Sequence, residues 1–587
     1  MDAMRNAGVR PGAACTSTWF ARVLGLATAL ILAAGCTPPG VPRKASGSDV
    51  AVPSPADPEA QAMSEVLAGE IAGQSGDLEQ AMVHYLRAAE LSDDPQLAAR
   101  ATRIAMFAGN PGDAAVRAAQ RWLKLDPDSI EAHQTLALLY IRKGETDAAV
   151  EHLESVLRLY EGRKGHGYLA IAASLAKEKE SGSALEAMRL LVERHAADSD
   201  AWQALGILAL EAGSPRQALE AANRTLALDP DRTEALVLRA DAYQALGDLD
   251  AAIRAMRQAV QAAPQDFDRR LRLGRLLVQA ERYGQARKVF QALLKLRPND
   301  ETLLYTLGLL NLQARDLAQA RRYFKRLADV GGQRRQEAWF YLGQIAEEQG
   351  KVHEALRWYR RIEPGEYFIE ARGRMAELLA RQGRLDEARA VLARAREQVS
   401  STAEGVRLYL LEGQILRDAK RYEEGMALYN RALTEYPGNE DLLYARAIMA
   451  ERLGRIDWAE RDFKAILAAD PDNAAALNAL GYTLADHNLR LDEALEYIQK
   501  ALQLTPDDPT VVDSLGWVYY RMGKPEVAER YLRKAYGLLQ DPEIGGHLVE
   551  VLWKLGKRRE AGNILRELLR AHPDNDALEA LRRRLSL

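Results

Sequence analysis

A proline that returns at a nearly constant interval is the feature that most constrains the fold of this chain. In two long runs the interval is 34 or 35 residues, and the prolines that mark it are Pro230, Pro264 and Pro298, then Pro437, Pro471 and Pro506. A fixed period of this length indicates one structural unit repeated many times, in which each unit buries its apolar face against its neighbours. The sequence therefore predicts one elongated repeat domain rather than several independent domains.

One unit, residues 199–232, shows how the spacing predicts local structure. Its first half places Gly206 among apolar residues at helical spacing, and the glycine leaves room for a second helix to approach. Gly213 is suited to a turn, and Ala222 lies on the apolar face of the second half. Pro230 ends the unit because proline lacks an amide hydrogen and disfavours helix in the residue before it. We therefore expect two antiparallel helices in each unit.

This pattern resembles the tetratricopeptide repeat, a helix–turn–helix unit of 34 residues. The resemblance implies an all-α superhelical solenoid of about fifteen antiparallel helix pairs, which we expect over residues 61–575. Residues 576–587 are expected to form a capping helix, because Leu578, Leu581 and Leu585 share one face. The arginines at 582–584 would keep its outer face soluble.

The first 35 residues have the layout of a secretory signal peptide. Arginines precede an apolar run over residues 23–34, which is too short to span a membrane comfortably. The run ends in Gly35 and Cys36 and resembles the lipobox of bacterial lipoproteins, although Ala33 stands where leucine is commonest. The resemblance implies cleavage before Cys36 and attachment of acyl chains such as palmitate to that cysteine. A simple secreted protein and an uncleaved anchor are the alternatives.

Residues 36–60 are expected to comprise the lipidated cysteine and a disordered, proline-rich tether. Six prolines with several serines and alanines cannot bury a core there. Thr37 follows Cys36 in place of aspartate, and by resemblance to proteobacterial lipoproteins this favours the outer membrane, with the solenoid facing the periplasm. Cys15, the other cysteine, would leave with the signal peptide, so the mature chain would have no disulfide.

Composition and motifs argue against several functional classes. The net charge is −4, and removing residues 1–35, which carry three arginines and one aspartate, would leave −6. A mildly acidic chain with mixed charges gives no basis for nucleic-acid binding. The sequence contains no glycine-rich phosphate loop, nucleophile elbow or paired-histidine zinc motif, and its nine histidines are scattered. We therefore expect no enzyme activity, no catalytic or metal-binding residues, no cofactor and no small-molecule substrate.

Recognition by a surface remains, and the repeat register locates a candidate site. In tetratricopeptide folds the inner wall of the superhelix is lined mainly by positions 2, 5, 9 and 12 of each first helix. In the last three units these positions place aromatic side chains beside hydrogen-bonding groups, and the candidate partner-binding residues are Asn478, Tyr482, Asp513, Trp517, Tyr520 and Trp553. Such a strip suits an extended peptide, which needs polar partners for its backbone and apolar ones for its side chains. The alternative is that these aromatic residues pack between neighbouring helices.

Basic residues in the middle of the chain form a second candidate site. They are Arg269, Arg270, Arg272 and Arg275 on one first helix, and Arg321, Arg322, Lys325 and Arg326 on a later second helix. Together they could form a basic patch for an acidic partner. The alternative is a solvated face whose charges pair with neighbouring glutamates.

The C-terminal third carries a narrower resemblance. The segments 476–482, 513–520 and 541–553 are similar to those of large tetratricopeptide lipoproteins of Gram-negative bacteria. Within that group the chain most resembles lipoproteins that partner the carboxyl-terminal processing protease CtpA. This implies a non-catalytic adaptor that binds the periplasmic serine-type protease and presents substrates such as cell-wall hydrolases. The alternative is a structural scaffold or assembly factor of an envelope secretion or polysaccharide-export complex.

The predicted anchor can be tested at one residue. Cys36→Ala should abolish labelling by a fatty-acid analogue and leave the chain uncleaved or mislocalised, because no other cysteine remains in the mature chain to carry lipid. Metabolic labelling of cells followed by fractionation measures both effects. Label that persists on the variant would exclude Cys36 as the lipidated residue.

Overall fold

The computed structural model describes residues 57–107, 112–160, 162, 164–178 and 181–586. The predicted signal peptide, Cys36 and the tether up to residue 56 therefore lie outside the described residues. In the described part of the chain the regular structure is helical, without strands, and consists of 31 helices, α2 to α32. The predicted all-α repeat of about fifteen pairs is confirmed. None of the described helices is long and apolar enough to cross a membrane.

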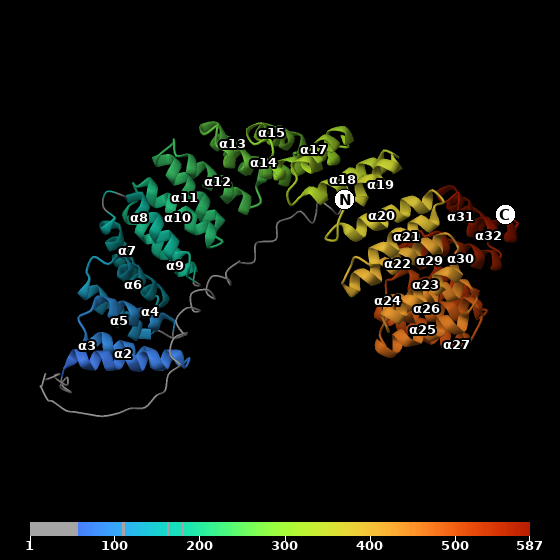
Figure 1. Cartoon of the computed structure of the whole chain (residues 1–587), viewed down its shortest axis with the longest axis horizontal. Coiled ribbons are helices and arrows are strands. Elements are labelled where there is room, and N and C mark those ends of the chain that lie inside the picture. The colour runs from blue at the N-terminus through green and yellow to red at the C-terminus, as the bar shows by residue number, and fades with distance from the viewer. Residues whose placement is uncertain (1–56, 108–111, 161, 163, 179–180, 587) are drawn as a thin grey trace, which may run out of the picture. The chain divides into compact units, whose positions relative to one another are not determined.

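Helices α2 to α6 form one compact unit (Figure 1). Their bounds are α2 Pro58–Gln74, α3 Leu78–Leu91, α4 Pro95–Phe107, α5 Gly112–Leu125 and α6 Ile130–Arg142. Within this unit each helix packs against the next one in the chain.

Helices α7 to α32 form a second compact unit. Its first half comprises α7 Thr146–Leu159, α8 Lys164–Leu175, α9 Ser181–Arg194, α10 Ser199–Glu211, α11 Pro215–Leu228, α12 Thr233–Ala245, α13 Leu249–Ala262, α14 Phe267–Gln279, α15 Tyr283–Leu296, α16 Glu301–Gln313, α17 Leu317–Val330, α18 Arg335–Glu348 and α19 Val352–Arg360. Its second half comprises α20 Phe368–Arg381, α21 Leu385–Arg396, α22 Thr402–Asp418, α23 Tyr422–Glu435, α24 Glu440–Arg452, α25 Ile456–Ala469, α26 Ala474–Asp486, α27 Leu491–Leu504, α28 Pro509–Arg521, α29 Pro525–Leu538, α30 Pro542–Lys554, α31 Arg558–Ala571 and α32 Asp576–Leu585.

The pair α10 and α11 shows why these residues form two helices. The carboxylate of Asp198 caps α10 by accepting a hydrogen bond from the backbone amide of Asp200. Gly213 lies between the two helices with a φ of +69°, in the left-handed region that favours glycine. Helix α11 ends at Leu228, two residues before Pro230, as the proline spacing predicts.

Neighbouring helices approach closely where one of them carries glycine. A Cβ atom added to Gly206 of α10 would lie 2.5 Å from Leu238 of α12 and 3.3 Å from Ala221 of α11. A Cβ atom added to Gly308 of α16 would lie 2.5 Å from the ring of Phe324, which is fully buried in α17. The glycines thus admit side chains from their own pair and from the next one. Consecutive pairs thereby share a continuous apolar core.

The two ends of the described helices differ slightly from the predicted boundaries. Helix α2 begins at Pro58 with Asp57 as its N-cap, so the predicted tether, which extends to residue 60, overlaps the helix. Proline is compatible with the first position of a helix, because that position needs no amide hydrogen and its φ is close to the fixed φ of proline. At the other end α32 buries its three leucines and exposes its three arginines.

Substitution of a packed glycine should destabilise the stack. Gly308→Ala is expected to lower the free energy of unfolding by about 1–3 kcal/mol, because the methyl group would displace the Phe324 ring. Gly284→Ala in the neighbouring α15 is the matched control, since an added Cβ meets no atom within 4 Å there. Urea denaturation followed by circular dichroism compares the two variants. Equal stability of both would contradict the close-packing account.

Candidate functional site

Three adjacent first helices, α26, α28 and α30, carry all six predicted partner-binding residues. Helix α26 packs beside α28, and α28 packs beside α30. Side chains one repeat apart in sequence therefore become neighbours on this surface.

Trp517 of α28 connects several of these residues. Its indole Nε1–H donates a hydrogen bond to Asp486 Oδ1 at 3.0 Å. Its ring stacks on His547 of α30, with a centroid distance of 4.1 Å, and lies 5.2 Å from the ring of Tyr520. Only 4% of Trp517 is exposed. In this structure Trp517 is therefore packed between neighbouring helices, and Tyr482 and Tyr520 keep more exposed surface than it does.

His547 joins Asp513 and Tyr482 in a polar network. Its Nδ1 atom lies 2.9 Å from Asp513 Oδ2, and its Nε2 atom lies 3.5 Å from the hydroxyl of Tyr482. The Tyr482 hydroxyl donates to Glu543 Oε1 at 3.1 Å. Burial lowers the pKa of His547, but the carboxylates of Asp513, Glu543 and Asp486 outweigh it, so the pKa is raised above 6.5. Burial, followed by the same carboxylates, raises the pKa of Tyr482 as well.

The other predicted aromatic residues lie toward α30 and α31. Tyr520 donates a hydrogen bond to Glu550 Oε1 at 3.4 Å. Trp553 is half-buried, and the guanidinium group of Arg558 lies 5.0 Å from its ring centroid. Both aromatic residues pack against the same apolar cluster of the last helices. The structure thus gathers Tyr482, Asp513, Trp517 and Tyr520 and places Trp553 at their C-terminal edge.

Two of the predicted residues carry buried acceptors without a hydrogen-bond partner among the described residues. These atoms are Asn478 Oδ1 and Asp513 Oδ1, at the fifth position of α26 and α28. The fifth residue of α10, Gln203, carries a third such acceptor, Oε1. The repeat therefore places unpaired acceptors on the same side of first helices in different parts of the chain.

Several residues of this region were not identified from the sequence. His547 and Glu543 of α30 and Asp486 of α26 lie among the predicted residues, yet in the sequence His547 is one of nine scattered histidines. The repeat period offered a usable signal, because His547 lies 34 residues after Asp513. A carboxylate and an imidazole one period apart on two first helices are a sequence pattern that indicates such a contact.

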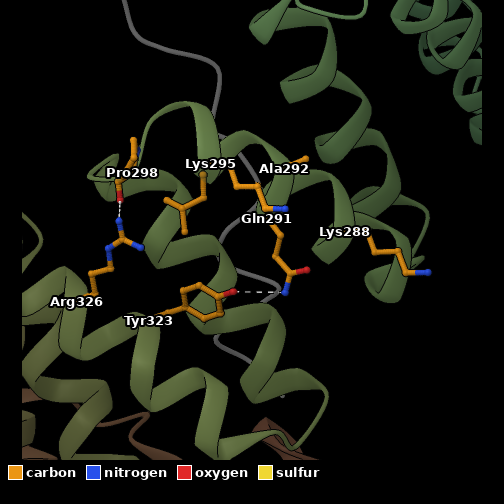
Figure 2. Close-up of a pocket in the computed structure, with 8 residues that line it drawn as sticks. Lys288, Gln291, Ala292, Lys295, Pro298, Tyr323 and Arg326 are labelled. Carbon is orange, nitrogen blue, oxygen red and sulfur yellow. Dashed lines mark hydrogen bonds between the residues drawn. The ribbon is translucent and has the colours of Figure 1, made fainter.

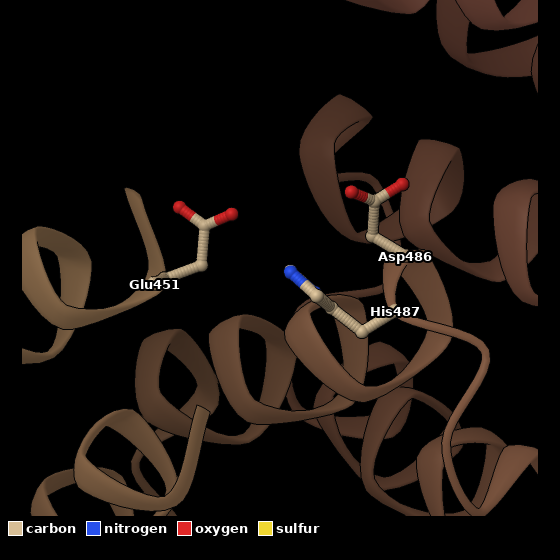
Figure 3. Close-up of side chains that lie close together, drawn as sticks. All are labelled: Glu451, Asp486 and His487. Atoms are coloured by element: carbon tan, nitrogen blue, oxygen red, sulfur yellow. The ribbon is translucent and has the colours of Figure 1, made fainter. Parts of the chain in front are cut away.

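Glu451, Asp486 and His487 bring three potential metal ligands together from α24 and the end of α26 (Figure 3). One donor atom of each lies within 4.8 Å of the others. The Nδ1 atom of His487 lies 3.1 Å from the carbonyl oxygen of Thr483, which leaves Nε2 for another partner. Burial raises the pKa of Glu451. Carboxylate and imidazole groups of this kind are common ligands of zinc.

Most of the mid-chain basic residues that form contacts pair with carboxylates. Arg269 contacts Glu234 at 3.2 Å and Asp266 at 3.1 Å, and Arg272 contacts Asp241 at 2.8 Å. Arg321 contacts Glu354. For these arginines the structure agrees with the alternative of a surface paired with acidic neighbours. Arg326 differs, because its guanidinium group donates to the backbone carbonyl of Pro298.

Arg326 lines a groove between α15 and α17 that the sequence did not identify. The groove has a volume of about 570 Å³. Its lining residues are Lys288, Gln291, Ala292, Leu294, Lys295, Pro298, Tyr323 and Arg326 (Figure 2). Gln291 donates to the Tyr323 hydroxyl at 3.4 Å across the groove. Lysines of α15 thus join an arginine of α17 around one concave surface.

The raised pKa of His547 predicts a pH dependence of stability. The protonated ring is stabilised in the folded state, so its contribution is fully present below pH 6.5 and is lost as the pH rises through the folded pKa. Relative to a His547→Gln variant, the wild type should lose stability as the pH rises above 6.5. Denaturation at a series of pH values measures the difference. A difference that grows with rising pH would contradict the assigned direction.

Comparison with known proteins agrees with the repeat geometry. Three family models described as tetratricopeptide repeat match the chain: one over residues 243–310, one over 204–267, 305–367, 374–440 and 444–509, and one over 130–162 and 513–538. Solved structures of a tetratricopeptide repeat protein from Parabacteroides merdae and a thermophilic TPR protein from Thermus thermophilus are also similar. The first is 16% identical, with a TM-score of 0.36 over 43% of this chain and 99% of that one. The second is 27% identical, with a TM-score of 0.28 over 30% and 95%.

Relatives with curated names differ greatly in coverage. Protein O-mannosyl-transferase Tmtc2 of Drosophila melanogaster is 36% identical over 92 residues, which cover 15% of this chain and 10% of that protein. A TPR repeat-containing protein of Pseudomonas aeruginosa is 33% identical over 572 residues, covering 90% of both chains. Tetratricopeptide-repeat models thus match many segments of the second unit, and the relative from Pseudomonas aeruginosa matches this chain over nearly its whole length. The chain therefore belongs to the tetratricopeptide-repeat family, whose fold is suited to binding protein partners.

Proposed function

We propose that this protein is a non-catalytic adaptor that binds a carboxyl-terminal processing protease and presents protein substrates to it, cell-wall hydrolases among them. The observation that carries the proposal is the set of unpaired acceptors on the first helices, at Gln203, Asn478 and Asp513. A buried acceptor without a hydrogen bond costs about 1–3 kcal/mol. These acceptor atoms are covered in the described structure, so the backbone amides of an extended polypeptide would reach them, and remove this cost, only after the surrounding side chains shift.

The aromatic residues beside these acceptors support the same kind of ligand. Tyr482 is half-buried near Asp513 and Glu543 and offers part of its ring to a side chain of the bound segment. Trp517 is buried and would not contact the peptide itself. Its contacts with Asp486 and His547 hold that carboxylate and that imidazole in place. A peptide would thus meet polar acceptors and an apolar surface side by side.

A repeat array can serve as an adaptor without catalytic residues. Two proteins bound to one chain meet at a raised effective concentration, which accelerates their reaction without a new contact between them. We propose that the array is held at the outer membrane, facing the periplasm, through lipid on Cys36. The signal-like segment before Cys36 and the proline-rich segment after it support this placement.

The proposal predicts an activity that appears only in the presence of the protease. The mature protein should cleave nothing alone and should accelerate degradation of a cell-wall hydrolase by a purified carboxyl-terminal processing protease. Asn478→Ala should slow this degradation roughly two- to tenfold at low substrate concentration, the effect of one lost hydrogen bond. Its melting temperature should not fall, because Asn478 Oδ1 has no partner to lose in the described structure.

Two further variants make the result specific. Asn223→Ala changes an exposed asparagine on α11 and should leave degradation unchanged. Trp517→Ala removes a buried ring and should cost about 3–5 kcal/mol of stability, so it reports packing rather than binding. Normal degradation with Asn478→Ala would show that the surface of α26, α28 and α30 does not bind the substrate. Co-purification with channel or synthase subunits instead of a protease would favour the scaffold alternative.

A further inference from the structure

The groove between the second helices α15 and α17 has positive charge without negative charge to balance it. Lys288, Lys295 and Arg326 line it, and no aspartate or glutamate does (Figure 2). Helix α15 contains no acidic residue at all. The whole chain has a net charge of −4, so the groove is a local exception to an acidic molecule.

A contact that recurs in other helix pairs shows what the groove lacks. In three of them the tenth residue of the second helix is a cation that binds a carbonyl of the preceding loop and the aspartate that follows it. These contacts join Arg121 to the Ser92 carbonyl (3.0 Å) and Asp93 (2.6 Å), Lys500 to the Pro471 carbonyl (2.6 Å) and Asp472 (2.9 Å), and Lys534 to the Pro506 carbonyl (3.4 Å) and Asp507 (3.5 Å). In each case the aspartate neutralises the cation.

Arg326 is the tenth residue of α17 and makes the same carbonyl contact, at 2.5 Å from the oxygen of Pro298. The next residue is Asn299, where Asp472 and Asp507 stand in the two later units. Since an amide carries no charge, the guanidinium group lacks the neutralising partner. Lys288 and Lys295 also have no carboxylate among the residues that line the groove with them, and no ion pair is formed by either within the described part of the chain.

We propose that this groove binds an acidic segment of a partner protein. Carboxylates of that segment would supply the negative charge that Asn299 does not, while Ala292, Leu294 and Tyr323 offer apolar contact to a neighbouring side chain. The groove volume of about 570 Å³ is that of a typical ligand pocket, which can hold a few residues of a bound segment. An anionic membrane is a poorer fit, because it is flat and engages clusters of about 4–8 cations.

The inference does not depend on the proposed adaptor function. The groove lies on second helices, whereas the unpaired acceptors of the inner wall lie on first helices. A failure of protease binding would therefore leave the groove untouched, and a failure of the groove would leave the inner wall untouched.

Fluorescence anisotropy with a fluorescein-labelled glutamate-rich peptide containing leucine tests the proposal on the full chain. The wild type should bind this peptide, should not bind its glutamine analogue, and should lose affinity as salt rises, because the attraction is electrostatic. Combined reversal of Lys288, Lys295 and Arg326 to glutamate should weaken binding at least about tenfold.

Two single substitutions provide a matched comparison. Asn299→Asp restores the aspartate found in the other units and should weaken peptide binding roughly two- to fivefold with no loss of thermal stability. Asp472→Asn frees Lys500, on a different helix pair, and should not weaken peptide binding. Unchanged affinity in both Asn299→Asp and the triple reversal would overturn the proposal. Capture by phosphatidylglycerol vesicles that depends on the three cations, without peptide binding, would also overturn it and assign the groove to a membrane.

Discussion

Close approach of helices at small residues is the constraint on which the rest of this structure depends. Gly206 and Gly308 have no room for a side chain, because Leu238 and Phe324 occupy the space where a Cβ atom would stand. Alanines on the second helices, such as Ala221, complete these contacts. A core built in this way is thin and continuous, so each pair is stable only through its neighbours. Polar and charged groups are then left for the faces of the stack.

The two faces use those groups differently. Along the second helices, cations bind loop carbonyls and aspartates of the preceding pair, as Lys500 and Lys534 do. Exposed ion pairs of this kind contribute little each, about 0–1 kcal/mol, but each one neutralises a cation of a second helix. The first helices carry acceptors such as Asn478 Oδ1 that have no partner in the described structure. A bound partner can stabilise the protein most at positions where a charge or a hydrogen-bond acceptor has no partner within the chain.

The sequence predicted the helix pairs well because the evidence for them is local. Gly213 marks a turn and Pro230 marks a helix end wherever the rest of the chain lies. The start at Pro58 was missed, since a proline among other prolines also fits a tether. For the candidate site, the sequence predicted which side of the first helices the residues lie on, but not how buried each side chain is. The spacing placed Trp517 on an inner wall, but its burial depends on His547 of the next pair, and no local pattern shows that contact.

The unpaired acceptors raise the question of how the free protein tolerates them. Each costs about 1–3 kcal/mol, which is a large part of the stability of an ordinary small domain. In a stack the cost is local, because stability is close to a sum of unit and interface terms. Gln203 lies in α10 and Asn478 in α26, many pairs apart, so their costs burden different interfaces. A long repeat array can therefore keep binding groups unsatisfied at several places and remain folded, whereas a compact domain with one core would have to bear the same costs together.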